Sequence, residues 1–159
     1  PCMGVAKSDY DVGLTGLALL ALLARGDTPT QGQYADAIAR GVAFLRTKQK
    51  KDSGSYVDTA RLGFLYEHCL ATEALCEVAL VDPSLDLRAE LMRAVQLIHE
   101  ARNPRGAWRY AFPPNGDNDT SVTSWCVSAL AAAQRAGFDV DPNAMAGARW
   151  WIDRATDPK

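Results

Sequence analysis

Apolar residues recur along the chain at the three-to-four-residue spacing of α-helices, in six stretches separated by glycine, proline and polar residues. The pattern predicts helices over about residues 12–25, 32–49, 58–80, 85–101, 119–136 and 142–155. The first, third and fifth stretches are apolar nearly all round, which is typical of helices buried on both sides. The second, fourth and sixth stretches each carry a single apolar stripe. We therefore expect an all-α protein built from pairs of one inner and one outer helix.

Residues at the ends of these stretches agree with the predicted boundaries. Gly26 and Gly137 follow the first and fifth stretches, where glycine ends helices readily. Pro83 and Pro142 lie at predicted helix starts, where proline is tolerated. The segment Asp119-Thr120-Ser121 offers several possible N-caps for the fifth helix.

The helix-pair pattern is repeated three times. The segments 15–22, 68–75 and 123–130 align without gaps, at spacings of 53 and 55 residues, and the segments 41–45, 94–98 and 148–152 recur in step. Small residues hold equivalent positions in the inner stretches, which allows neighbouring helices to approach closely. We expect one domain over residues 1–159, with repeats at approximately 11–57, 58–110 and 117–159.

A glycine and an aromatic residue follow each of the first two outer stretches. The first set is Gln49, Gly54 and Tyr56, and the second is Gly106 with Trp108. These segments resemble the QW repeats of the squalene cyclase and protein prenyltransferase superfamily. The chain is also similar to uncharacterised bacterial squalene-cyclase-like repeat proteins. The resemblance implies an α/α toroid (terpenoid cyclase-like), of which three helix hairpins would make about half a barrel.

The chain departs from the QW pattern at several positions. Arg102 and Thr156 stand where the second and third repeats would have glutamine, and Tyr56 replaces tryptophan in the first. In physical terms, the glycine permits a tight turn and the aromatic side chain packs on the next repeat. QW repeats describe an architecture and leave the activity open.

Composition narrows the classes of partner. The net charge is −2, with 48% hydrophobic and 23% charged residues, as in ordinary soluble globular chains. Acidic and basic residues alternate, so no nucleic-acid surface is expected. The basic run over residues 46–51 suits the negative end of a helix dipole. No apolar run reaches the roughly 20 residues that cross a bilayer, and we expect no membrane span.

Four cysteines, at positions 2, 69, 76 and 126, are scattered without a CxxC pair. Unpaired thiols of this kind favour a reducing, cytoplasmic-type compartment, although the native compartment itself stays open. The chain opens with Pro1 and without a signal-peptide pattern, so we expect a processed or excised piece. Its expected partners are the rest of a longer chain or a second copy.

Candidate functional residues gather where the inner helices begin. If these helices run parallel, their N-termini converge at one mouth and favour anions or polarised groups there. Thr15, His68 and Thr123 are aligned, and Asp11 and Asp119 lie one turn earlier in the first and third repeats. Of these residues, Asp11, Thr15 and Thr123 are predicted to bind a ligand.

His68 differs from its two aligned threonines and is a candidate general base or metal ligand, with Tyr66 and Asp119 as further candidate catalytic residues. The alternative is a histidine that bonds a neighbouring backbone or carboxylate group without reacting. Asp117 and Trp125 are added as ligand-binding candidates, the latter because an aromatic face stabilises cations.

The resemblance offers two chemistries. Class II terpene cyclases use a D-x-D-D acid, which Asp117-Asn-Asp119-Thr120 matches except at its last position, and the same residues also suit a turn leading into an N-cap. Prenyltransferases bind zinc through Asp, Cys and His. Tyr66-Glu-His68-Cys69 is similar, but Ser121 stands where the cysteine after the aspartate is needed. We therefore expect no cofactor and no metal, with zinc disfavoured.

Three functions remain open from the sequence. The first is a non-catalytic scaffold, similar to prenyltransferase and squalene-cyclase repeats, which binds a small molecule, a peptide or a protein. The second is an isoprenoid cyclase or transferase using Asp119 and His68, and three repeats alone can scarcely enclose its cavity. The third is a carbohydrate-binding or carbohydrate-active α/α barrel.

Overall fold

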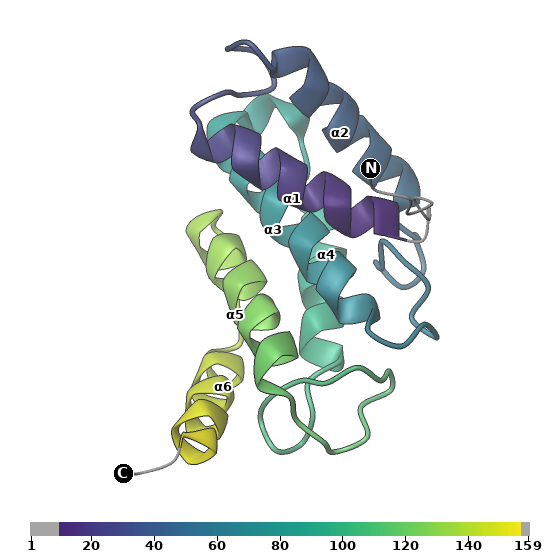
Figure 1. Cartoon of the computed structure of the whole chain (residues 1–159), viewed down its shortest axis with the longest axis vertical. Coiled ribbons are helices and arrows are strands. Elements are labelled where there is room, and N and C mark those ends of the chain that lie inside the picture. The colour runs from purple at the N-terminus through teal and green to yellow at the C-terminus, as the bar shows by residue number, and fades with distance from the viewer. Residues whose placement is uncertain (1–9, 157–159) are drawn as a thin grey trace, which may run out of the picture.

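The computed structural model describes residues 10–156 of the chain, which fold into six α-helices and one short 3₁₀ turn (Figure 1). No strand occurs among these residues, so the all-α prediction is confirmed. In chain order the elements are α1 (Asp11–Ala24), α2 (Ala35–Lys48), α3 (Phe64–Val81), η2 (Pro83–Leu85), α4 (Arg88–Glu100), α5 (Thr120–Arg135) and α6 (Pro142–Ala155).

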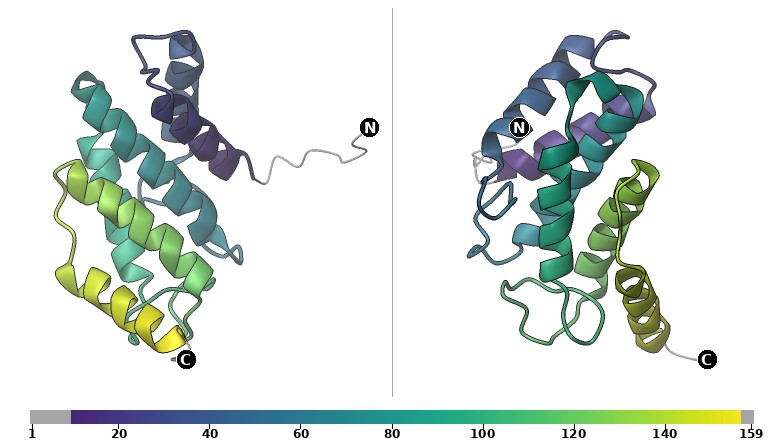
Figure 2. Two further views of the ribbon diagram at one scale, coloured as in Figure 1. Left: turned by 60° about the vertical axis from the view of Figure 1, so that its left-hand side comes forward. Right: turned by 180° about the vertical axis from the view of Figure 1, so that it is seen from behind.

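The helices form two layers. Helix α3 packs between α1 and α5, and each of these three helices also packs on the helix that follows it, α2, α4 or α6. Figure 2 shows α1, α3 and α5 side by side in one direction. Side-chain pairs fix that direction for α3 and α5, because Tyr66 meets Ser121 at their starts and Glu77 meets Arg135 at their ends. The N-termini of the inner helices therefore lie at one end of the layer.

Three predicted helix starts were wrong by three residues or more. The second helix begins at Ala35 rather than near residue 32. The third helix begins at Phe64 rather than near residue 58, because Gly63 has a left-handed backbone with φ of 82° and the preceding residues form turns. The fourth begins at Arg88 rather than near 85, because Asp86 has φ of 44°. Helical spacing of apolar residues continues through both turns, so periodicity alone overextends these helices.

Helix caps are easier to predict than helix starts, because a cap depends on the side chains of a few adjacent residues. Asp119 is the N-cap of α5, where its Oδ1 accepts a hydrogen bond of 2.9 Å from the Val122 N–H. Asp141 caps α6 in the same way through the Asn143 N–H, with Pro142 at the first helical position. The prediction of an N-cap within residues 119–121 is confirmed.

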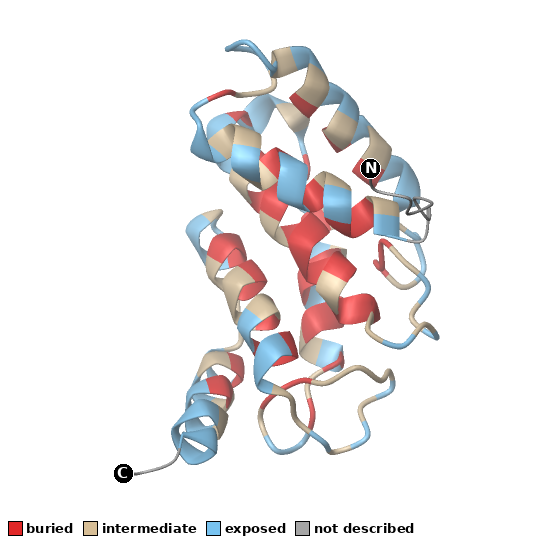
Figure 3. Cartoon of the chain, in the orientation of Figure 1, coloured by how far each residue is buried: buried red, intermediate tan, exposed pale blue. Residues whose placement is uncertain are grey.

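The degree of burial differs among the inner helices. Helix α3 is buried along most of its length, as Figure 3 shows, because it has a neighbour on each side. Helix α1 leaves Leu14 60% and Leu17 44% exposed. The expectation that inner helices are buried on both sides therefore holds for α3 and is wrong for α1, which lies at the edge of the layer.

Small side chains set the spacing within the inner layer. A Cβ added at Gly16 of α1 would lie 2.8 Å from the Leu70 carbonyl of α3, so only glycine allows this approach. Between α3 and α5, the Sγ atoms of Cys69 and Cys126 lie 3.5 Å apart. These two thiols and Cys76 are free and buried, and Cys2 lies outside the described residues.

The outer helices are tied together through residues at their ends. The Gln49 side chain follows α2 and donates to the carbonyls of Gly54 and Glu90, at 3.1 and 2.8 Å, while Arg93 donates to its Oε1. Arg102, at the equivalent position after α4, forms an ion pair of 3.1 Å with Asp141, the N-cap of α6. Two different side chains thus join one outer helix to the next.

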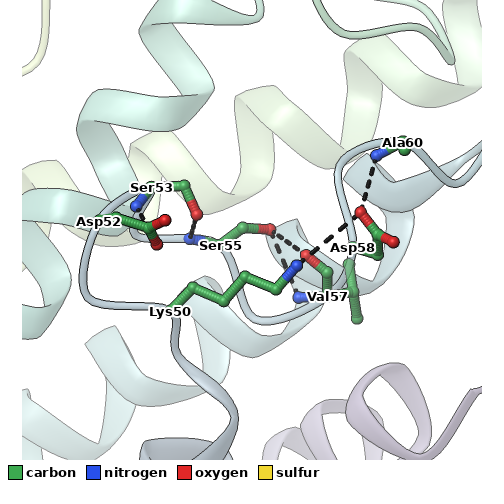
Figure 4. Close-up of polar contacts among 7 residues, drawn as sticks. All are labelled: Lys50, Asp52, Ser53, Ser55, Val57, Asp58 and Ala60. Carbon is green, nitrogen blue, oxygen red and sulfur yellow. Dashed lines mark hydrogen bonds and ion pairs between the residues drawn. The ribbon is translucent and has the colours of Figure 1, made fainter.

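The turn between α2 and α3 is held by its own polar groups (Figure 4). Ser55 is fully buried, and its hydroxyl donates to the Val57 carbonyl at 2.7 Å. Lys50 also pairs with Asp58 across the turn at 3.8 Å, between two exposed side chains. These contacts hold Tyr56, only 2% exposed, against the core.

Within residues 10–156, no helix has the length and apolar character needed to cross a membrane.

Candidate functional site

A pocket of about 470 Å³ opens at the N-terminal end of the inner helices. It lies beside the first turn of α3 and the loops that lead into α1 and α5. Three tyrosines from three different segments supply much of its wall. Its lining consists of Tyr10, Arg61, Leu62, Gly63, Tyr66, Glu67 and Tyr110.

A chain of hydroxyl groups connects this pocket to a carboxylate. The Tyr66 and Ser121 hydroxyls lie 2.7 Å apart, and Ser121 donates to Oδ1 of Asp119 at 2.6 Å. Tyr110 donates to Oδ2 of the same carboxylate at 3.1 Å. The rings of Tyr66 and Tyr110 are neighbours, with centroids 6.1 Å apart. The structure therefore brings together two predicted site residues, Tyr66 and Asp119.

The hydrogen bonds determine the charge of this network. The Ser121 hydroxyl, the Val122 N–H and the Tyr110 hydroxyl all donate to Asp119 and lower its pKa. Hydrogen bonding with Tyr66 and with Asp119 raises the pKa of Tyr110 to about 12. At neutral pH the network thus holds Asp119 as an anion and Tyr110 as a protonated phenol, an arrangement suited to accepting and donating hydrogen bonds.

Glu67 occupies the inner wall of the pocket and is 5% exposed. Its Oε2 accepts a hydrogen bond of 3.2 Å from the Gly13 N–H in the first turn of α1, and its carboxylate pairs with Arg61. A helix N-terminus has unpaired N–H groups, so Glu67 of α3 caps a neighbouring helix about fifty residues away in sequence. One side chain therefore contributes both to the pocket wall and to the contact between α1 and α3.

His68 lies in a different environment from Asp119. It is fully buried, its Nε2 lies 3.0 Å from the Ala94 carbonyl of α4, and its ring packs against Tyr56 and Phe64. Burial lowers the pKa of His68 to about 4, so the ring is neutral and Nε2–H is the donor. This environment is the one expected of a histidine that bonds a backbone group without reacting.

The remaining predicted ligand-binding residues are dispersed. Asp11 and Thr15 line a separate groove between α1 and α2. Thr123 is buried and bonds the backbone of Trp108. Asp117 is exposed and pairs with Arg109 at 3.2 Å, and Trp125 is half-buried against the core. None of these five lines the tyrosine pocket.

Of the seven residues that line the pocket, sequence reasoning selected only Tyr66 as a site residue. Tyr110 lies in the same turn as Trp108, but only Trp108 is fully buried. Tyr10, Arg61 and Glu67 drew no separate prediction. An available signal was that an aromatic residue lies within about ten residues of the start of each inner helix, at Tyr10, Tyr66 and Tyr110.

Among the described residues, no group of three or more histidine, cysteine or acidic side chains is placed to hold a metal ion. Comparisons of the chain with protein-family models, with curated proteins and with solved structures found no significant match.

Proposed function

We propose that this chain is a binding scaffold, whose ligand occupies the tyrosine pocket at the mouth of the inner helices. In this proposal the three helix pairs are repeats of an α/α toroid, about half a barrel, related to the squalene cyclase and prenyltransferase repeats of bacterial proteins. The parallel order of α1, α3 and α5 and the recurring glycine–aromatic turns support it. The fold relation and the function are separate proposals, because a toroid wall hosts many activities.

The observation that carries the function is the pairing of Tyr66 and Tyr110 above the Asp119 carboxylate. Their rings offer apolar faces, while the phenolic hydroxyls and the carboxylate offer hydrogen-bonding groups. A pocket of about 470 Å³ is large enough for a small molecule or a few residues of a peptide. Such a surface favours a ligand with one flat or apolar face and hydroxyl or amide edges.

Carbohydrate is the second candidate, and it is favoured by the same geometry. Sugars present an apolar ring face and several hydroxyl donors. The ring face would pack on Tyr66 or Tyr110, and the sugar hydroxyls would bond the phenolic hydroxyls of the pocket, one of which already donates to Asp119. This alternative differs from the first only in the chemical class of ligand.

An isoprenoid enzyme has less support. The acid of a cyclase must carry a proton, whereas three donors stabilise Asp119 as an anion. The phenol of Tyr110, with its pKa raised to about 12, is a weak acid. His68 is buried away from solvent, and its one N–H donates a hydrogen bond to the Ala94 carbonyl.

The test is a nuclear magnetic resonance titration of the full chain with cellobiose, maltose, farnesyl diphosphate and short aromatic peptides. We expect one class to shift backbone signals of residues 61–67 and 108–110, and Tyr66→Ala to weaken that binding at least tenfold. Tyr34→Ala is the matched control, because Tyr34 is exposed outside the pocket. Binding by no class, or equal weakening by both variants, would refute the proposed site.

A further inference from the structure

Two phenolic hydroxyls of the tyrosine pocket can serve a ligand only as hydrogen-bond acceptors. Ser121 gives its one proton to Oδ1 of Asp119 at 2.6 Å, so the Tyr66 hydroxyl, 2.7 Å from Ser121, is the donor of that pair. The Tyr110 hydroxyl gives its proton to Oδ2 of Asp119 at 3.1 Å. A phenol has one proton, so only lone pairs remain on the two oxygens. A ligand that bonds them therefore has to carry N–H or O–H groups.

The protein's own carboxylates already satisfy the N-termini of two inner helices at this mouth. Oε2 of Glu67 accepts a hydrogen bond from the Gly13 N–H in the first turn of α1. Asp119 caps α5 through the Val122 N–H. A helix N-terminus favours an anion, and at α1 and α5 the chain itself provides one. The positive ends of these two helices therefore give no reason to expect an anionic ligand.

The pocket and the network behind it carry a negative charge. Arg61 and Glu67 form an ion pair in the pocket wall, so their charges offset one another. The groups that donate to Asp119 are two hydroxyls and a backbone N–H, all of them neutral. They stabilise the carboxylate without cancelling its charge. An anion behind Tyr110, joined to it by a hydrogen bond, also makes the face of that ring more attractive to a cation.

Guanidinium groups already lie on two of the three tyrosine rings. The Cζ atom of Arg61 lies 5.3 Å from the centroid of the Tyr10 ring, and that of Arg109 lies 5.5 Å from the centroid of the Tyr110 ring. Each of these arginines also pairs with a carboxylate. A guanidinium is flat and carries five N–H donors, so it matches both an aromatic face and oxygens that only accept.

We propose that the tyrosine pocket binds a guanidinium group, whose flat face packs on Tyr66 or Tyr110 and whose N–H groups donate to the two phenolic oxygens. This inference rests on the proposed function and names the chemical class of its ligand. Asp119 is a positioning residue, because it acts through Tyr110 and Ser121 and keeps the phenolic protons turned away from the ligand. The guanidinium can belong to a free guanidine compound or to an arginine side chain of a peptide.

The experiment titrates the full chain, labelled with ¹⁵N, with acetyl-Gly-Arg-Gly-amide and with the same peptide containing citrulline, a neutral isostere of arginine. We expect the arginine peptide to shift signals of residues 61–67 and 108–110 and to bind at least fivefold more tightly than the citrulline peptide. This comparison needs no variant.

A pair of matched variants tests the role of the carboxylate. Asp119→Asn keeps a residue that caps helices but removes the charge. It should weaken binding of the arginine peptide at least fivefold and that of the citrulline peptide less than twofold. Asp141→Asn makes the same change at the N-cap of α6, which does not line the pocket, and should alter either affinity less than twofold.

The outcomes separate this inference from the proposed function. Equal binding of the two peptides, or equal weakening by Asp119→Asn and Asp141→Asn, would overturn the guanidinium and leave the pocket as a binding site. Shifts of the pocket signals by a sugar but not by the arginine peptide would do the same. Absence of shifts with every probe would refute the binding site itself. Methylguanidine distinguishes the two sources: affinity equal to that of the arginine peptide supports a free guanidine compound, and affinity at least tenfold weaker supports a peptide arginine.

Discussion

The ring of Tyr56 packs on the ring of His68, with centroids 5.5 Å apart and planes inclined by 32°. In the next helix pair the same two positions hold Trp108 and Thr123, which are joined by hydrogen bonds to the Trp108 backbone. The second pair thus combines the smaller aromatic residue with the larger inner-helix residue, and the third pair combines the larger aromatic residue with the smaller one. His68 therefore completes the volume of a buried contact between α3 and the preceding turn.

This complementarity predicts coupling between the two positions. Tyr56→Trp alone should cost about 1–3 kcal/mol through overpacking. His68→Thr alone should cost a similar amount, about 1–3 kcal/mol, through a cavity and a lost hydrogen bond. The double variant, which copies the third pair, should be more stable than the sum of the two costs by at least about 1 kcal/mol. Urea unfolding of the four proteins measures the coupling, and strictly additive costs would contradict it.

His68 also predicts a pH dependence of stability. Burial lowers its pKa in the folded state to about 4, whereas an unfolded histidine titrates near 6.5. The unfolded chain binds the extra proton between these values. The contribution is therefore fully present above pH 6.5 and is lost as the pH falls toward 4, by roughly 3 kcal/mol in total. Urea unfolding at pH 7.5 and 4.5 should show the loss.

The double variant Tyr56→Trp/His68→Thr serves as the control for this pH effect, since it lacks the histidine but retains the acidic residues. It should lose roughly 2 kcal/mol less than the wild type over the same interval. Parallel losses in the two proteins would show that other groups cause the pH dependence.

Two glycines with the same φ angle allow the cost of backbone strain to be separated from the cost of steric contact with a neighbouring helix. Gly106 and Gly116 both have φ of 89°, but an added Cβ meets Gly147 at 2.8 Å in the first case and nothing within 4 Å in the second. Gly116→Ala should cost about 1 kcal/mol of conformational strain. Gly106→Ala should cost clearly more, about 3 kcal/mol, because α6 must move away. Equal changes in the urea midpoint for the two variants would show that a side chain at position 106 does not clash with α6.

The cap that Glu67 provides for α1 predicts a cross-helix effect. Glu67→Ala removes the acceptor of the Gly13 N–H and leaves the partly buried Arg61 without this carboxylate. We expect a loss of about 2 kcal/mol in the free energy of unfolding and faster amide exchange at Gly13. Glu100→Ala is the control, since that glutamate is exposed at the end of α4. Unchanged exchange at Gly13 in Glu67→Ala would contradict the cap.

Much of the candidate site could not be predicted from the sequence. Tyr66 and Asp119 were selected because they precede or begin inner helices, and the structure brings them together through Ser121. Tyr110 could not be separated from Trp108, because both lie in one turn and only packing shows which is buried. Alignment put Thr15 and His68 at one position, although one lines an open groove and the other a closed core.

The sequence by itself determined the helical class, the pairing of helices and the N-cap at Asp119, because helix periodicity and capping depend on residues within a turn of one another. Only the tertiary structure decided where Tyr66, Glu67 and His68 face. Successive helix positions turn by about 100°, so these neighbours reach the mouth, α1 and α4 respectively. The partners in these three hydrogen bonds come from segments more than twenty residues away, and their approach depends on packing.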